Sequence, residues 1–115
     1  MSRGLGDVYK RQVEVKPELQ ALKDKLAAMT ETYSKAVEKV TAVEDAAYGD
    51  FMARRLVEMA GVTIMSYLLL LDANRNESFI RSAEVYSNLA QAEVTKHSEF
   101  INSFNPSEVG LYKVD

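Results

Sequence analysis

The stretch MAGVTIMSYLLLLDANRNE, residues 59–77, decides how the rest of this sequence is interpreted. Its first 13 residues, Met59 to Leu71, carry no charge, and an aspartate, two asparagines and an arginine follow soon after. Such a run is typical of either a membrane-spanning segment or a buried helix. A spanning helix needs about 20 predominantly apolar residues. The short run therefore favours a buried helix and predicts no insertion into a membrane.

Composition indicates one helical domain. The chain has 115 residues, of which 47% are hydrophobic and 27% charged, and it contains only 5 Gly and 2 Pro. So few glycine and proline residues favour long helices over a β fold with many turns. The absence of cysteine excludes disulfides and cysteine nucleophiles, and it fits a reducing, cytoplasmic location. A net charge of −3 offers no basic face, so we expect no nucleic-acid partner.

Before the quoted stretch, apolar residues recur at alternating spacings of three and four. This period predicts an amphipathic helix over residues 17–47 with one narrow apolar seam, and Pro17 suits its first turn. Gly49 and Asp50 then predict the end of this helix and the N-cap of the next, which runs over residues 51–74. The seam consists of Leu19, Leu22, Leu26, Met29, Tyr33, Ala36, Val40, Val43 and Ala47.

A third helix is expected to start near Asn76, after the polar residues DANRNE, and to end before Pro106. Three helices with short connections predict an all-α fold, an antiparallel bundle of three long helices. The residues at helical spacing in the third helix are Phe79, Ala83, Tyr86, Ala90, Val94, His97, Phe100 or Ile101, and Phe104.

Residues 1–12, MSRGLGDVYKRQ, lack this periodicity and have a basic balance. They are interpreted as a disordered or non-native leader, which leaves residues 13–115 as the domain. The segment GLG at 4–6 lacks the Lys-Ser/Thr ending of a phosphate-binding loop.

The central helix has more apolar surface than its neighbours can cover. At about 100° per residue, Glu58 and Asp72 lie within about 40° of each other, so the polar face is present at both ends and missing between them. A helix that is apolar all round must be covered all round. Two flanking helices with narrow seams do not suffice, and we expect a partner outside this chain to cover the face from Met59 to Leu71.

The residues that could carry chemistry each have a simpler structural interpretation. His97 is the single histidine, and Glu93 lies one turn before it. A core-edge histidine, hydrogen-bonded to Glu93 or to a tyrosine, is favoured over a metal ligand or a general base. Asp72 and Arg75, at i and i+3, predict a local ion pair at a helix end rather than a substrate contact.

The remaining motifs are weak. Asn76-Glu77-Ser78 matches the glycosylation acceptor pattern, but no secretory signal accompanies it. Tyrosines at helical positions are more often core aromatics with a hydrated hydroxyl than a ligand box. The sequence therefore predicts no catalytic, cofactor-binding or metal-binding residues. The tyrosines concerned are Tyr33, Tyr48, Tyr67 and Tyr86.

Two segments resemble a known family: YLLLLDANRNESFIRSAEVYSNLAQAEVTKHSEFINSFNP at 67–106 and LKDKLAAMTETYSKAVEKV at 22–40. They are similar to the extreme C-terminal helical region of bacterial acyl-CoA dehydrogenases in which an extra helical domain follows the flavin-binding fold. The resemblance covers roughly residues 17–112. It implies a parent oxidoreductase of fatty acid β-oxidation that uses FAD and a glutamate base. No residue here matches the flavin-binding segments or that base.

The resemblance implies that this chain is a fragment, a C-terminal accessory domain that is not catalytic on its own. It would pack against the rest of the parent enzyme or against a second subunit of a homo-oligomer. The alternative is a free-standing helical interaction module that self-assembles through the seam of residues 19–47. An upstream reading frame that encodes a flavoprotein would distinguish the first interpretation from the second.

Overall fold

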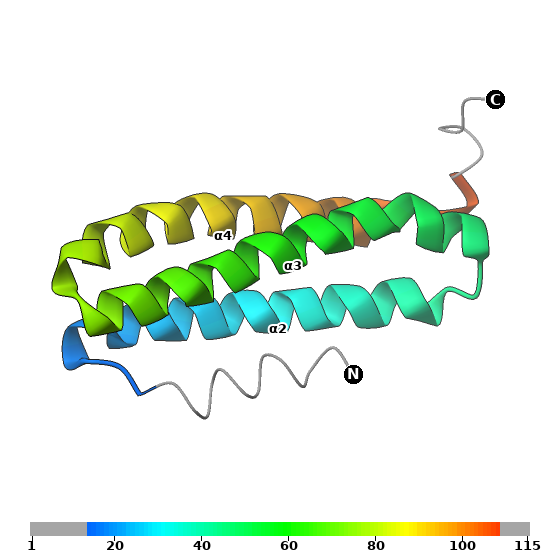
Figure 1. Cartoon of the computed structure of the whole chain (residues 1–115). Helices are drawn as coiled ribbons and strands as arrows, with labels where there is room; N and C mark the ends of the chain where they lie inside the picture. Colours follow the sequence, from blue (N-terminus) through cyan, green and yellow to red (C-terminus); the bar gives the residue numbers. More distant parts are fainter. Residues whose placement is uncertain (1–13, 109–115) are drawn as a thin grey trace.

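The fold is a bundle of three long antiparallel helices, shown by the computed structural model in Figure 1. The structure describes residues 14–108, so the predicted leader at 1–12 and the tail from 109 lie outside the described residues. The predicted all-α architecture is confirmed. The elements are η1 (Pro17–Leu19), α2 (Gln20–Ala42), α3 (Ala46–Arg75), η2 (Glu77–Phe79), α4 (Ile80–Ser103) and η3 (Pro106–Glu108).

The boundary between α2 and α3 differs from the prediction. The first helix ends at Ala42, and α3 begins at Ala46, with Asp45 as its N-cap. The Asp45 carboxylate accepts hydrogen bonds from the N–H groups of Ala47 and Tyr48, at 2.9 and 3.2 Å. The prediction that Gly49 ends one helix and Asp50 caps the next is therefore wrong.

The prediction failed because the seam continues across the turn. Val43 and Ala47 pack against the core even though Val43 caps the end of α2 and Ala47 opens α3. Gly49 lies in the first turn of α3 without a positive φ. Helical spacing alone therefore gave no sign of the break, and glycine was mistaken for a stop signal although it needed no left-handed backbone there.

The connection between α3 and α4 follows the prediction more closely. Arg75 ends α3, and the Asn76 side chain accepts a hydrogen bond from Ser78 N at 3.0 Å, which caps the 3-10 turn η2. Helix α4 then begins at Ile80, four residues after Asn76. The predicted start of the third helix near Asn76 holds for the 3-10 turn η2, which Asn76 caps, while α4 itself follows with Phe79 at its N-cap and no side-chain cap hydrogen bond.

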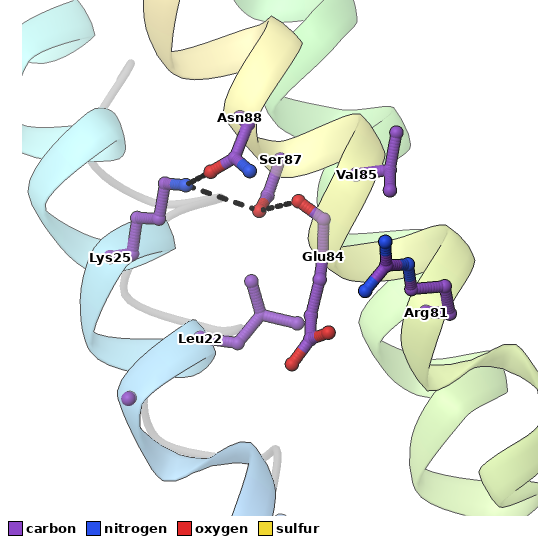
Figure 2. A pocket seen from close by; sticks show the side chains of 8 residues that line it. Leu22, Lys25, Arg81, Glu84, Val85, Ser87 and Asn88 are labelled. Atoms are coloured by element: carbon purple, nitrogen blue, oxygen red, sulfur yellow. Dashed lines mark hydrogen bonds between the residues drawn. The ribbon is translucent and has the colours of Figure 1, made fainter.

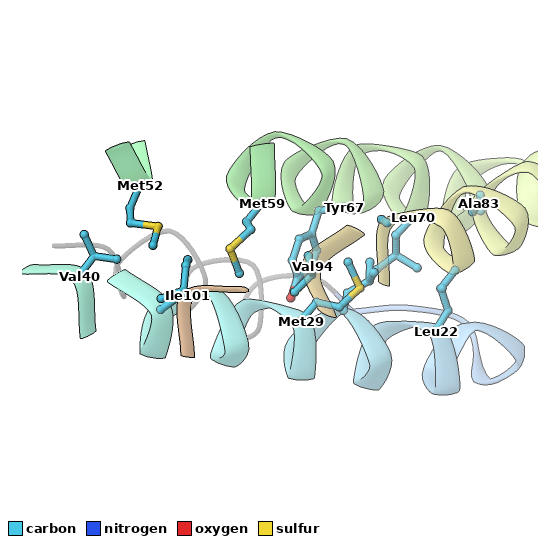
Figure 3. Close-up of a cluster of buried hydrophobic side chains, with 14 of the residues drawn as sticks. Leu22, Met29, Val40, Met52, Met59, Tyr67, Leu70, Ala83, Val94 and Ile101 are labelled. Carbon is cyan, nitrogen blue, oxygen red and sulfur yellow. The ribbon is translucent and has the colours of Figure 1, made fainter. Parts of the chain in front are cut away.

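The core lies along the axis between the three helices, where side chains from all of them meet (Figure 3). The predicted seam supplies the α2 side of this core, and its Tyr33 is only half-buried. A fully buried leucine or methionine contributes about 1.5–3 kcal/mol through the apolar surface it removes from water. The buried seam residues are Leu19, Leu22, Leu26, Met29, Ala36 and Val40, and they meet Met52, Met59, Tyr67 and Leu70 of α3 and Ala83, Ala90, Val94 and Ile101 of α4.

Candidate functional site

The outward face of α3 carries exposed apolar side chains. Val57 is 70% exposed, Met65 44%, Leu68 43% and Ile64 37%. The exposed Gly61 lies among them, and a Cβ built there would meet nothing within 4 Å. We call these five residues the outer stripe. The prediction that the chain's own helices leave part of the central helix uncovered is confirmed by this surface.

Charged residues stand at both ends of the outer stripe. Asp50 and Arg54 precede it and are exposed, and Asp72 and Arg75 follow it. Arg75 Nη2 lies 3.4 Å from Asp72 Oδ1, so the predicted local ion pair at the helix end is confirmed. Arg75 is largely in solvent and Asp72 is about half-exposed, and a pair near the surface contributes about 0–1 kcal/mol.

His97 is buried, but its partner differs from the predicted one. Its Nε2 lies 3.2 Å from Glu58 Oε1 of α3. The contact is close enough for an ion pair when the imidazole is protonated, although Nε2 makes no hydrogen bond within the described part of the chain. The expected hydrogen bond to Glu93 or to a tyrosine is thus wrong, because the carboxylate in contact with Nε2 comes from a neighbouring helix and Glu93 pairs with Lys96.

Glu93 instead pairs with Lys96. Its Oε2 lies 2.8 Å from Lys96 Nζ, and this hydrogen bond lowers the pKa of Glu93, while partial desolvation opposes the shift. The positive charge of Lys96 and the proximity of His97 act in the same direction as the hydrogen bond. The carboxylate therefore serves as a surface ion-pair partner, and it does not bind His97.

A surface groove of about 410 Å³ lies between α2 and α4 (Figure 2). Lys25 of α2 donates hydrogen bonds to Ser87 Oγ, at 3.3 Å, and to Asn88 Oδ1, and Ser87 Oγ donates to Glu84 O at 2.9 Å. Two neutral acceptors thus hold the ammonium group and link the two helices. Lys25 and Ser87 are a lysine and a hydroxyl in contact, but the Ser87 hydroxyl donates its proton to the Glu84 carbonyl and accepts from Lys25, so the arrangement bridges two helices. Sequence spacing could not reveal this contact, because Lys25 and Ser87 are 62 residues apart.

The tyrosines occupy core positions with different polar surroundings. Thr30 donates to the Tyr67 hydroxyl at 3.2 Å, and burial raises the pKa of Tyr67 while this hydrogen bond opposes the rise. Burial also raises the pKa of Tyr48, whose hydroxyl has no hydrogen-bond partner within residues 14–108. Tyr33 and Tyr86 are half-buried. The interpretation as core aromatics holds for Tyr48 and Tyr67, but the Tyr48 hydroxyl is not hydrated at the surface, because its ring is fully buried.

An aromatic cluster that the sequence did not indicate joins the start of α3 to the end of α4. The Phe51 and Phe104 rings stack with their centroids 5.1 Å apart. The Arg55 guanidinium lies 4.7 Å from the Phe51 centroid and 4.8 Å from that of Phe100. Cation–π contacts of this kind contribute about 0.5–2 kcal/mol. Their role here is to join two helices rather than to bind a ligand.

Within residues 14–108, no group of three or more His, Asp or Glu side chains gathers in a way that could hold a metal ion. Asn76, the first residue of the glycosylation pattern, uses its side chain to cap η2. The GLG segment at 4–6 lies outside the described residues. The outer stripe, as the exposed apolar surface of the central helix, is the candidate functional site for binding another protein.

Helix α3 is longer and more apolar than the charge-free run predicts. Helix α3 is 30 residues long with a window of mean hydropathy 1.6, so by length and composition alone it could cross a bilayer. The charge-free run from Met59 to Leu71 is only part of this helix, so the run alone understates its apolar length. The core helix of a soluble protein can be equally long and apolar, and 33% of the most apolar part of α3 is buried within this bundle. The absence of membrane insertion stays a prediction.

Comparisons with known proteins give a consistent result. Residues 7–109 match the family described as acyl-CoA dehydrogenase C terminal. The matched range starts within the segment predicted to be a leader, so a boundary at residue 12 stays a prediction. A crystal structure of an acyl-CoA dehydrogenase family protein from Porphyromonas gingivalis is similar, with 42% sequence identity and a TM-score of 0.83. The match covers 91% of this chain and 90% of that one, so the two are of similar length. Curated protein sequences give no significant match.

Proposed function

The chain belongs to the acyl-CoA dehydrogenase C-terminal family, and from this premise we propose that its outer stripe packs within an assembled, FAD-dependent acyl-CoA dehydrogenase. As a helical accessory domain of that enzyme family, the chain would support the catalytic body or a subunit interface without performing the oxidation. The observation that carries the proposal is the exposed apolar surface on α3, from Val57 to Leu68. Such a surface is typical of a site for another protein.

The described residues do not fit a flavin site. The hollow between α2 and α4 is a surface groove lined by Lys25, Arg81 and Glu84 together with a few apolar side chains. A flavin ring needs an enclosed, mostly apolar pocket with a few well-placed polar groups, and the groove does not provide one. In our proposal FAD, the glutamate base and the acyl-CoA cleft belong to the rest of the parent enzyme, which would act in β-oxidation in the cytoplasm.

The alternative, self-assembly through the seam of residues 19–47, needs a surface that is buried in this structure. Self-assembly through the seam of residues 19–47 requires that seam to be available to another molecule. Leu26 is 0% exposed, Leu19 1% and Met29 3%, because the seam packs against α3 and α4 of the same chain. A free-standing module would therefore have to associate through another face.

The source DNA upstream of codon 13 tests the proposed function directly. We expect an open reading frame, continuous with this one, that encodes a flavin-binding acyl-CoA dehydrogenase body. An upstream frame that encodes an unrelated protein would contradict the proposal. In the full-length enzyme, Leu68→Arg should lower the thermal stability of the assembly, because a charged side chain would replace a packed one. The matched variant Leu89→Arg, at a leucine of α4 that is 58% exposed, should leave the assembly unchanged.

A further inference from the structure

The charges on α3 are arranged so that the helix complements a copy of itself. We propose that α3 packs antiparallel against α3 of a second copy of this chain, about a two-fold axis near residue 63. This inference rests on the proposed function, because it names the occupant of the outer stripe. Two-fold packing brings residue i of one copy against residue j of the other, and residue j against residue i.

The surface that takes part is one continuous face of α3. At about 100° per residue, its members fall within an arc of about 100°, which is the width of a helix–helix contact face. From Asp50 to Arg75 the face is about 37 Å long at 1.5 Å per residue. Its members are Asp50, Arg54, Val57, Gly61, Ile64, Met65, Leu68, Asp72 and Arg75.

Charge order along this face selects the orientation. Within this arc it reads negative and positive at Asp50 and Arg54, apolar across the outer stripe, then negative and positive at Asp72 and Arg75. Glu58 lies about 20° outside the arc, and its carboxylate lies 3.2 Å from His97 of α4. Antiparallel packing about residue 63 places Arg54 against Asp72 of the second copy, and Arg75 against Asp50 of the second copy. Each pair forms twice. Parallel packing would place every charge against its own kind, which is unfavourable.

The centre of the face suits close approach of two helices. In the same register, Gly61 lies opposite Ile64 and Met65 of the second copy, and Val57 lies opposite Leu68. Because Gly61 has no side chain, the apolar residues opposite it have room to pack near the helix backbone. All four apolar side chains of the outer stripe would then leave water together.

The charged residues are free to make these contacts. Within residues 14–108, Asp50 and Arg54 form no ion pair. The contact between Asp72 and Arg75 is exposed and 3.4 Å long, so exchanging it for an intermolecular pair costs little. One helix pair lies at the small end of specific interfaces, so we expect micromolar association of the isolated chain. In a full-length enzyme, neighbouring subunits would raise the effective concentration.

A charge exchange tests the proposal in the 115-residue chain by sedimentation velocity over a range of concentrations. Arg54→Glu should weaken dimerisation by about tenfold, because it breaks two pairs and creates two repulsions. Asp72→Arg should have a similar effect. The double variant R54E/D72R should restore the dimer to within about threefold of the original, because both pairs re-form with reversed sign. Residues 54 and 72 lie about 27 Å apart on one helix, so a rescue within one chain is excluded.

Matched leucine substitutions locate the surface. Leu68→Arg should abolish the dimer, whereas Leu89→Arg, on the exposed face of α4, should leave it intact. Both side chains are exposed, and circular dichroism should show unchanged helicity in each variant. If helicity falls in the Leu68 variant, the charge exchange decides, because Arg54 is exposed and Asp72 is half-exposed, so neither substitution disturbs the core.

The proposal is overturned by a chain that stays monomeric up to near-millimolar concentration, or by a dimer that the double variant does not restore. A monomer that binds lipid vesicles or the separate catalytic body would likewise identify a different occupant. If the upstream DNA encodes a flavoprotein but the chain stays monomeric, this inference is wrong and the proposed function stands. If the double variant restores the dimer but the upstream DNA encodes an unrelated protein, the proposed function is wrong and this inference stands.

Discussion

The side-chain amide of Asn74, the second-to-last residue of α3, forms two hydrogen bonds with the backbone on either side of Val15, and one of them comes from Lys16. Asn74 Nδ2 donates to Glu14 O at 2.8 Å, and its Oδ1 accepts from Lys16 N at 2.9 Å. One side chain thus supplies both a donor and an acceptor, as a neighbouring β-strand would. The contact holds the segment before η1 against the end of α3 that leads into η2.

Asn74→Ala should release this segment. Both hydrogen bonds are exposed, so we expect a loss of about 1 kcal/mol in the free energy of unfolding and faster amide exchange at Lys16. Asn74→Asp keeps the acceptor for Lys16 N but loses the donor to Glu14 O, so its effect on exchange at Lys16 should be smaller. Hydrogen exchange followed by NMR measures both. Equal exchange rates at Lys16 in the original chain and in the Ala variant would contradict the assignment.

Asp45 and Asp50 provide a direct test of where α3 begins. Asp45→Ala removes the acceptor for two N–H groups of the first turn and should cost about 1 kcal/mol of stability. Asp50→Ala, at an exposed position within the helix, should change stability by less than about 0.5 kcal/mol. Urea unfolding at low micromolar concentration, where self-association does not contribute, measures both values. The opposite ranking would place the N-cap at Asp50.

Periodicity predicted the elements of this fold better than their ends. The alternating spacing from Leu19 to Val40 identified the α2 side of the core, because a residue that recurs once per turn must face the same neighbours. The turn at 43–45 was missed because the residues on both sides of it also pack against the core. When a helix break does not interrupt the spacing of the apolar residues, the hydrophobic pattern cannot reveal it.

The candidate site could be predicted only in part. A central helix without a complete polar face predicts an uncovered surface, and the exposed Val57 and Leu68 confirm it. The partner of His97 could not be predicted, because Glu58 lies 39 positions earlier and meets it only once α3 and α4 are packed. Sequence spacing gives neighbours on the same helix, such as Glu93. It does not give the rotation of one helix against another.

Glu93 and Lys96 give the structure a testable pH dependence. The hydrogen bond from Lys96 lowers the pKa of Glu93 below its usual 4.5 in the folded state. Its contribution to stability is therefore present above the unfolded pKa and is lost as the pH falls through the lower, folded value. NMR titration of the Glu93 carboxyl should show this shift, and Lys96→Met should move the pKa back upward. A Lys96→Arg variant, which retains the cation, should preserve most of it.

Tyr48 and Tyr67 should respond in opposite ways to loss of their hydroxyls. Tyr67→Phe removes the acceptor of the Thr30 hydrogen bond and should cost about 1 kcal/mol. Tyr48→Phe removes a fully buried hydroxyl that has no partner among the described residues, so it should be neutral or stabilise the chain by up to about 1 kcal/mol.

The alkaline behaviour of the two variants provides an independent check. Burial raises the pKa of Tyr48 above its usual 10.0 in the folded state, so the folded chain holds the hydroxyl proton more tightly than the unfolded chain does. The resulting contribution to stability is lost as the pH rises from the unfolded to the folded value, because the unfolded chain releases its proton first. Tyr48→Phe should therefore lose less stability above pH 10 than the original chain does. A Tyr48→Phe variant with strongly reduced stability at neutral pH would show that the hydroxyl has a partner after all, since the ring itself is unchanged.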